Sequence, residues 1–292
     1  MSSAMKRPIA IFLSIILLLL AFAHVNNVFS QEQTTWEKYH EAGRQALERG
    51  DYAEAETQLK AALKEASGFG LKDQRLTETL NTLAGVYRAA GRFDEAETLY
   101  RRTLSITEAA LGPEHLNVAA SLNNLALLLY TRGRYEEVTR LLQRALSITE
   151  KELGPEHADV AGRLTNLAQV YRVQRNYAEA EPLLLRAVVI REKTLGAEHE
   201  SAAVALDNLA ALYNAQKKYS MAEPLLKRSL AIKTKALGPE HVQVALAMEN
   251  YADTLTRLKR DAEATELRAR AKSIWAKVMK KKKTTPPSPN GA

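Results

Sequence analysis

The residues best suited to chemistry in this sequence are four histidines that each follow a glutamate: His115, His157, His199 and His241. An imidazole beside a carboxylate could bind zinc or serve as a general base. These histidines, however, stand 42 residues apart, each closing a segment Leu-Gly-Pro-Glu-His or, once, Leu-Gly-Ala-Glu-His. A constant period of roughly 20–50 residues is typical of stacked repeat proteins, in which each unit packs against its neighbours.

Geometry argues against a metal ion shared by these histidines. Successive units are displaced by at least one helix spacing of about 8–10 Å, whereas the ligands of one zinc ion lie about 2.0–2.1 Å from it. We therefore expect each histidine to pack or hydrogen-bond at the corner between two units. The sequence also lacks Gly-x-Ser-x-Gly, a phosphate-binding glycine loop, His-Glu-x-x-His and cysteine. We predict a protein that is not an enzyme and has no metal and no cofactor.

The net charge of +7 is concentrated at the two ends of the chain. Seven of the 41 basic residues lie there, and the remaining 34 equal the 34 acidic residues. The terminal ones are Lys6, Arg7, Lys277 and Lys280 to Lys283. Lysines without interleaved aromatic residues supply only non-specific electrostatic attraction, so we expect no specific nucleic-acid partner.

The N-terminal residues read as an export signal. Lys6 and Arg7 precede an apolar run, Ile9 to Ala23, and small residues follow, which is the order of a secretory signal peptide. Cleavage after Ser30 is favoured over cleavage after Ala23. An extracytoplasmic protein, periplasmic or secreted, is therefore predicted. The alternative is an uncleaved anchor in the inner membrane, although a run of about 15 residues is shorter than the ~20 that span a bilayer.

Within each unit, apolar residues recur at helical spacing along two stretches. In the second unit, one stretch holds Leu80, Ala84 and Tyr87, and the next holds Ala96 and Tyr100. Spacings of three and four residues predict two amphipathic helices per unit. Alanine recurs at two of these positions, as expected where two helices cross closely.

Glycines mark the predicted helix ends. Gly91 and Gly133 follow the first helix of their units, and Gly112 and its copies follow the second helix. Glycine after a helix can take the left-handed conformation that ends it, so we predict that conformation at both kinds of position.

The pattern resembles the tetratricopeptide repeat (TPR). With Ala84 at the small eighth position of that family, Tyr87, Gly91, Phe93 and Ala96 fall where it has tyrosine, glycine, an aromatic residue and alanine. The usual period is 34 residues, and the period of 42 is similar to that of the kinesin light chain type. The resemblance implies an all-α fold, a right-handed α-solenoid of about six TPR helix pairs, whose first helices line a concave groove.

The predicted organisation has three parts. They are a signal peptide at 1–30, a TPR solenoid at 31–279 and a basic, proline-rich disordered tail at 280–292. The units are placed at about 35–70, 77–112, 119–154, 161–196, 203–238 and 245–278.

The resemblance also places a row of polar residues in the groove, two positions before the small alanine. The row is Thr82, Asn124, Asn166, Asn208 and Asn250. Amides can donate to and accept from the backbone of an extended peptide, or they could instead bridge adjacent repeats. Other predicted groove residues are Asn81, Asn123, Arg88, Tyr130, Arg172 and Asp207.

The sequence thus predicts a non-catalytic, exported scaffold that binds a peptide or protein partner in the groove. Alternatives are a membrane-anchored assembly factor and an accessory subunit of an enzyme complex. His40 and Arg44 stand where some TPR proteins have the lysine and asparagine that hold a terminal carboxylate, so we expect no binding of chaperone C-terminal tails.

Overall fold

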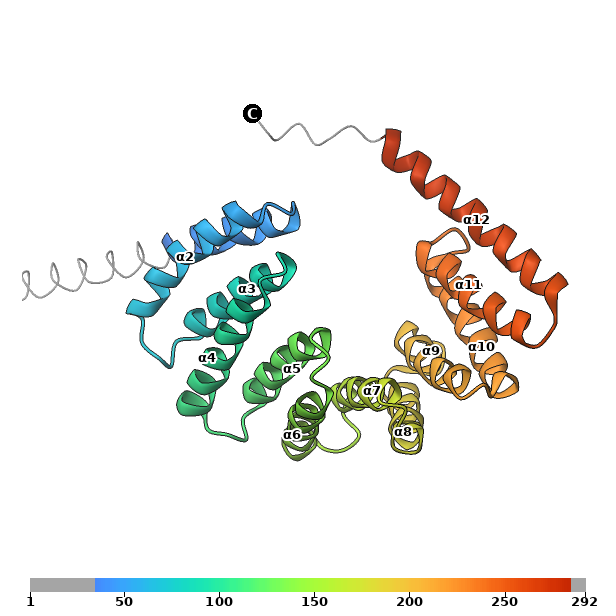
Figure 1. Ribbon diagram of the computed structural model, residues 1–292, viewed down its shortest axis with the longest axis horizontal. Coiled ribbons are helices and arrows are strands. Elements are labelled where there is room, and N and C mark those ends of the chain that lie inside the picture. The colour runs from blue at the N-terminus through green and yellow to red at the C-terminus, as the bar shows by residue number, and fades with distance from the viewer. Residues whose placement is uncertain (1–34, 285–292) are drawn as a thin grey trace, which may run out of the picture. The chain divides into compact units, whose positions relative to one another are not determined.

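The computed structural model describes residues 35–284, so the predicted signal peptide and residues 285–292 of the predicted tail lie outside the described residues. The regular elements of this range are α-helices arranged as consecutive pairs (Figure 1). The first helices of the pairs are residues 35–48, α3 (Gln74–Ala89), α5 (Leu116–Thr131), α7 (Ala158–Val173), α9 (Glu200–Ala215) and α11 (Val242–Arg257). The second helices are α2 (Tyr52–Gly68), α4 (Phe93–Leu111), α6 (Tyr135–Leu153), α8 (Tyr177–Leu195), α10 (Tyr219–Leu237) and α12 (Asp261–Thr284). The prediction of an all-α fold with about six helix pairs is confirmed.

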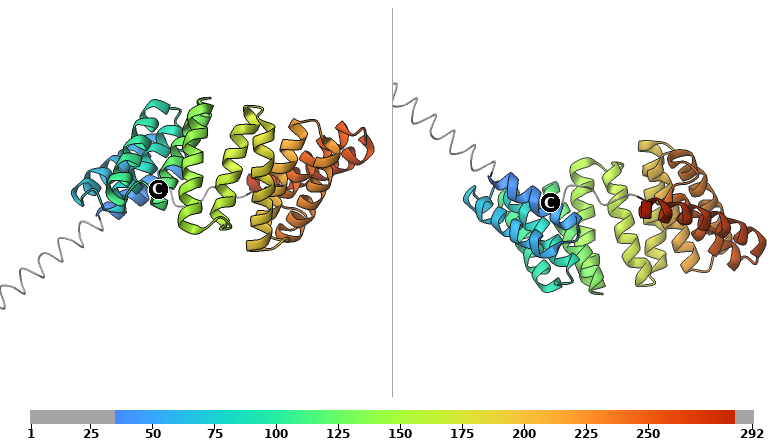
Figure 2. Two further views of the ribbon diagram at one scale, coloured as in Figure 1. Left: turned by 90° about the horizontal axis from the view of Figure 1, so that it is seen from below. Right: turned by 90° about the horizontal axis from the view of Figure 1, so that it is seen from above.

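The chain divides into two compact units, Met1–Leu128 and Leu129–Ala292, with the boundary inside α5. From here on, the first unit and the second unit are these two parts of the chain, and the 42-residue segments are called repeats. In the first unit α3 packs against both α2 and α4. In the second unit each helix from α6 to α12 packs against the next, and α7 also contacts α9. Figure 2 shows the helices of this second unit lying side by side.

The core of each unit is built on alanine at the helix crossings. Ala84 and Ala96 are fully buried in the first unit, and so are Ala168, Ala180 and Ala210 in the second. One apolar cluster of the second unit joins residues of α7, α8, α9, α10, α11 and α12. The absence of bulk at these positions lets neighbouring helices approach to about 8–10 Å.

The last helix is longer than predicted. The sixth repeat was expected to end at about residue 278, but α12 continues through the lysine run to Thr284. Lysine is a good helix former, and positive charge is favourable at a helix C-terminus. No proline precedes Pro286 in this stretch.

Among the described residues, no helix is both long enough and apolar enough to cross a bilayer.

The helix ends show two different turns. Gly91 and Gly133 have φ of 78° and 72°, and the equivalent Arg175, Lys217 and Lys259 have φ of 62°, 61° and 61°. The closing glycines differ from the left-handed helical conformation that the sequence predicted. Their φ is positive, but ψ is extended, as at Gly112 with φ 88° and ψ 157°. Three of these glycines precede proline, which favours ψ of about +120° to +160° in the preceding residue, but Gly196 precedes alanine and has ψ 148°, so the turn does not depend on proline.

Polar contacts join neighbouring helices around a carboxylate in the first unit. Glu56 on α2 accepts from the Lys60 ammonium at 2.7 Å, from the Arg92 guanidinium, and from the Tyr87 hydroxyl at 3.0 Å. These donors, with Lys60 the strongest, lower the pKa of Glu56 to about 2, although burial opposes them. In the second unit, Glu181 accepts from Tyr213 at 3.0 Å in the same way.

We expect Lys217→Gly to raise the free energy of unfolding by about 0.5–1 kcal/mol, because a lysine with positive φ is strained and glycine is not. Gly133→Ala, its matched control at an equivalent position, should lower the free energy of unfolding by about 1 kcal/mol, since its Cβ meets nothing within 4 Å and only the backbone changes. Urea unfolding measures both. A loss of stability in Lys217→Gly would show that the lysine side chain outweighs the strain.

The Glu56 carboxyl makes stability depend on pH. Because its folded pKa of about 2 lies below the ordinary 4.5, its contribution is complete above the unfolded pKa and is lost as the pH falls from 4.5 to 2. We expect Glu56→Gln to flatten the fall in melting temperature across this window. Glu65→Gln removes a carboxyl elsewhere on α2 and should leave the slope near that of the parent. Equal slopes in the parent and in Glu56→Gln would contradict the assignment.

Candidate functional site

The four repeated histidines cap helices. Each uses Nδ1 to accept a hydrogen bond from the backbone N–H two residues later, at the start of the next first helix. The donors are Asn117, Asp159, Ser201 and Gln243, at distances of 3.1–3.2 Å. The histidine thus does the work of a serine or aspartate N-cap, which confirms the predicted hydrogen bond at the corner. Within residues 35–284 no group of three histidine, aspartate or glutamate side chains gathers as a metal site.

Other charged residues at the same corner form ion pairs and hydrogen bonds that connect neighbouring repeats. Arg186 of α8 donates to Glu150 of α6 at 2.5 Å and to the Pro155 carbonyl at 2.7 Å, which connects the loop and α6 to α8. Glu156 in that loop bonds to Lys193 of the next second helix. The same pairs recur one repeat later as Arg228 with Glu192 and Lys235 with Glu198. The closing segment therefore connects repeats.

The predicted groove residues of the second unit lie on one face of its first helices. Asn166 on α7 and Asn250 on α11 are exposed, and Asn208 on α9 is half-buried. Val204 and Leu246, four residues before Asn208 and Asn250, are 47% and 49% exposed, and residues four apart share a helix face. We call these five residues the first-helix face. Sequence reasoning missed its two apolar members, although their four-residue spacing from the asparagines could have indicated them.

The asparagine side chains of this face differ in their hydrogen bonds. Asn208 Nδ2 donates to the Val204 carbonyl of its own helix at 2.8 Å, which leaves Oδ1 to accept from a partner. The Asn250 side chain makes no hydrogen bond within the described range. Neither of these two amides bridges to a neighbouring helix, so the alternative of inter-repeat bridging does not hold for them.

Thr82, the equivalent residue in the first unit, does bridge two repeats. The His40 ring is buried, stacks on Trp36 at 4.8 Å and hydrogen-bonds Thr82 Oγ1 at 3.2 Å. Burial lowers the pKa of His40, although nearby Glu78 opposes the shift. This histidine is therefore a structural residue.

The remaining predicted residues are half-buried on several helices. Asn81 and Arg88 lie on α3, and Asn81 Oδ1 and Arg88 Nε have no hydrogen-bond partner in the described part of the chain. Tyr130 packs edge-on against the nearby Tyr135 with ring centres 5.6 Å apart, so part of its ring is covered by a neighbour in the chain. The others are Asn123 and Asn124 on α5, Arg172 on α7 and Asp207 on α9.

Asp207 is engaged inside its own helix pair. Its Oδ2 pairs with the buried Lys233 ammonium of α10, and one repeat later Glu249 accepts from the Trp275 indole N–H at 3.0 Å. Both pairs join a first-helix residue to the second-helix residue 26 positions on. Because its Oδ1 is also buried, Asp207 is not accessible to a partner.

Two hollows open beside the first-helix face. One, of about 200 Å³, lies between α7 and α9 and is lined by Gly162, Asn166, Ser201 and Val204, with Arg191 reaching in from α8. The other, of about 230 Å³, lies between α9 and α11 and is lined by Asn214, Tyr219, Asp253, Thr254 and Arg257. The face thus combines exposed apolar side chains with amide and charged groups, which is the composition of a peptide-binding surface.

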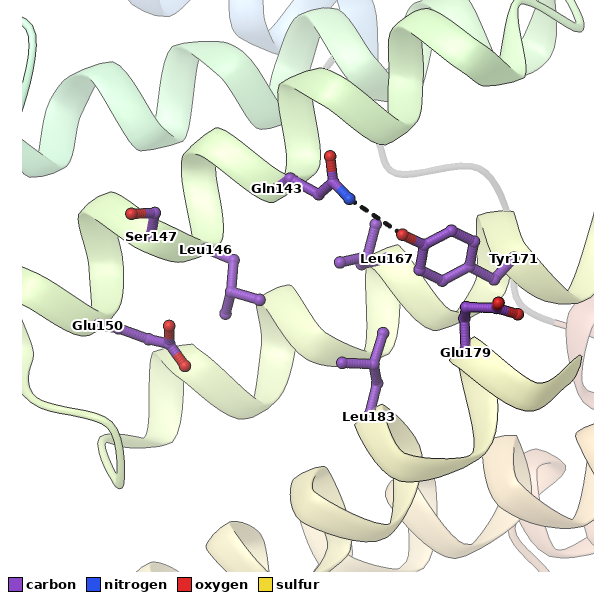
Figure 3. A pocket seen from close by; sticks show the side chains of 8 residues that line it. All are labelled: Gln143, Leu146, Ser147, Glu150, Leu167, Tyr171, Glu179 and Leu183. Carbon is purple, nitrogen blue, oxygen red and sulfur yellow. Dashed lines mark hydrogen bonds between the residues drawn. The ribbon is translucent and has the colours of Figure 1, made fainter. Parts of the chain in front are cut away.

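A larger and more apolar hollow of about 400 Å³ lies among α6, α7 and α8. Figure 3 shows Leu146, Leu167 and Leu183 around it, with Gln143 Nε2 donating to the Tyr171 hydroxyl at 3.0 Å above them. Glu150 at its edge is already bonded to Arg186. Ser147 and Glu179 also line this hollow.

Comparison with known proteins matches the sequence to the tetratricopeptide repeat profile at residues 75–151, 159–235 and 208–277. A second profile of the same description matches residues 39–61. No curated protein matches the sequence.

Several solved structures have a similar fold. The nearly identical TPR-like repeats of a Podosopora anserina protein assigned to the kinesin light chains are 29% identical, with a TM-score of 0.61 over 69% of this chain and 95% of that chain. BtubC from P. vanneervenii is 21% identical, with a TM-score of 0.64 over 90% and 95% of the two chains. Pseudomonas aeruginosa pilF is 18% identical, with a TM-score of 0.55 over 81% and 90%. At identities near 20% the likeness shows the fold alone.

Because Lys233 is buried and relies on Asp207, we expect Asp207→Asn to lower the free energy of unfolding by about 2–3 kcal/mol, the cost of leaving a buried charge unpaired. The matched control, Asn208→Ala on the same helix, should change it by less than about 0.5 kcal/mol. Thermal or urea unfolding of the two variants provides the comparison. Equal stabilities would mean that water, rather than Asp207, solvates the ammonium.

Proposed function

Because the chain belongs to the tetratricopeptide repeat family, we propose that it is a non-catalytic scaffold that binds an extended peptide of a partner protein across the first-helix face of α7, α9 and α11. Membership of this family implies protein–protein interaction. Proteins of this family are usually non-catalytic, and the family comparison finds no catalytic domain.

One observation carries the assignment to this face. On α9 and again on α11, an exposed apolar side chain lies one turn before an asparagine, as Val204 with Asn208 and Leu246 with Asn250. Exposed apolar residues that repeat in register on one face are typical of interaction surfaces. An extended peptide offers backbone N–H and C=O groups to the amides and side chains to the apolar positions. The repetition suits an elongated partner better than a small molecule.

We also propose that the protein acts outside the cytoplasm. The support is the sequence order at residues 1–30, a basic start followed by an apolar run and small residues. Mass spectrometry of the protein from an extracytoplasmic fraction should find a mature chain that begins at Gln31. An intact N-terminus that stays with the membrane would instead support the membrane-anchored alternative.

The groove assignment is tested by selecting short random peptides on the immobilised protein and remeasuring the best binder on Asn166→Ala with Asn208→Ala. We expect a loss of affinity of about five- to twenty-fold, since two amide hydrogen bonds contribute about 1 kcal/mol each at most. The melting temperature should stay nearly unchanged.

The matched control is Asn176→Ala, which removes an exposed amide that lies between α7 and α8 and makes no capping hydrogen bond. Its affinity should equal that of the parent. If the double variant binds the peptide as well as the parent does, another surface binds it. If the double variant unfolds, the asparagines are structural.

A further inference from the structure

One charged residue beside the first-helix face lacks the partner that its counterparts have. The pairs 26 residues apart that connect a first helix to its second helix are Asp207 with Lys233 and Glu249 with Trp275. One repeat earlier the same two positions hold Thr165 and Arg191. A neutral threonine thus stands where the following repeats have a carboxylate.

The Arg191 guanidinium is consequently uncompensated. It makes no hydrogen bond or ion pair with any residue in the range 35–284. Thr165 cannot donate to a ligand, because its hydroxyl already donates to the Ala161 carbonyl at 2.8 Å. Glu192, the adjacent acid on α8, is bonded to Arg228. A half-buried cation without a counter-charge is unfavourable, so the hollow is ready to accept an anionic group.

The guanidinium lies on the side of the chain where the peptide is proposed to bind. A Cβ added to Gly162 would stand 3.7 Å from Arg191 Nη2, which places the guanidinium over a glycine of α7. Arg191, Asn166 and Ser201 line the same hollow of about 200 Å³, with Val204 at its side. A planar guanidinium together with a hydroxyl and an amide forms a donor set that suits a carboxylate.

We propose that this hollow binds the side-chain carboxylate of an aspartate or glutamate in the partner's peptide. Arg191 supplies the charge, Asn166 and Ser201 supply further donors, and Val204 contacts an apolar residue next to the acid. This inference rests on the proposed function and specifies the peptide: an acidic residue beside an apolar one. The two following repeats cannot bind an acid in this way, because Asp207 already neutralises Lys233 and the third pair has a neutral tryptophan.

The test selects short random peptides with amidated C-termini on the parent, on Arg191→Gln and on Thr165→Asp. The parent should enrich peptides with an acidic residue at a fixed distance from an apolar residue, and both variants should lose that preference. Thr165→Asp retains the arginine and adds the carboxylate that the next repeat has. A loss of preference in this variant therefore comes from neutralising the Arg191 charge and not from removing the packing of its side chain. Thermal unfolding should show all three proteins folded.

The affinity is then measured for one capped consensus peptide and for the same peptide with its acidic residue replaced by the corresponding amide, asparagine or glutamine. We expect about tenfold weaker binding of the amide peptide to the parent, equivalent to about 1.4 kcal/mol, and no difference on Arg191→Gln. Selected peptides without an acidic preference, or a preference that persists in Arg191→Gln, would overturn this inference and leave the proposed function standing. Failure of the parent to enrich any peptide would overturn both.

Discussion

The close crossing of helices over alanine is the constraint on which the rest of the structure depends. Ala168 on α7 and Ala210 on α9 are fully buried against their neighbours, and a larger side chain would force the helices apart at a cost of about 1–3 kcal/mol. The alanine therefore fixes the rotation of its helix. A residue two positions earlier is turned by about 200°, so Asn166 and Asn208 must face away from the crossing. The polar face is a geometric consequence of packing.

The fold could be predicted from the sequence because the period is repeated many times. Each 42-residue repeat supplies the same apolar positions and the same helix ends, so one interpretation is supported by several copies. The end of the array lacks that support. There, helix propensity and charge decide the boundary, and α12 runs to Thr284 instead of stopping at the predicted position.

The candidate site was less predictable, because its features depend on side chains from different helices. The asparagine row followed from the register, but the exposure of Val204 and Leu246 did not. An apolar residue in a helical pattern is usually taken as core, and only the packing shows otherwise. The partners of Arg186 and Arg228 likewise became visible only once the neighbouring helix was in place. The shared fold provides the surface, and the residues that differ between repeats give it specificity.

The constant separation of the charged pairs has a consequence for how such a chain can change length. Arg186 and Arg228 each reach a glutamate 36 residues earlier, and Lys193 and Lys235 each reach one 37 residues earlier. A recombination event that copies or removes one 42-residue block joins each cation to an equivalent glutamate. The repeat is thus a unit of inheritance as well as of packing, and the protein can gain or lose binding surface in whole helix pairs.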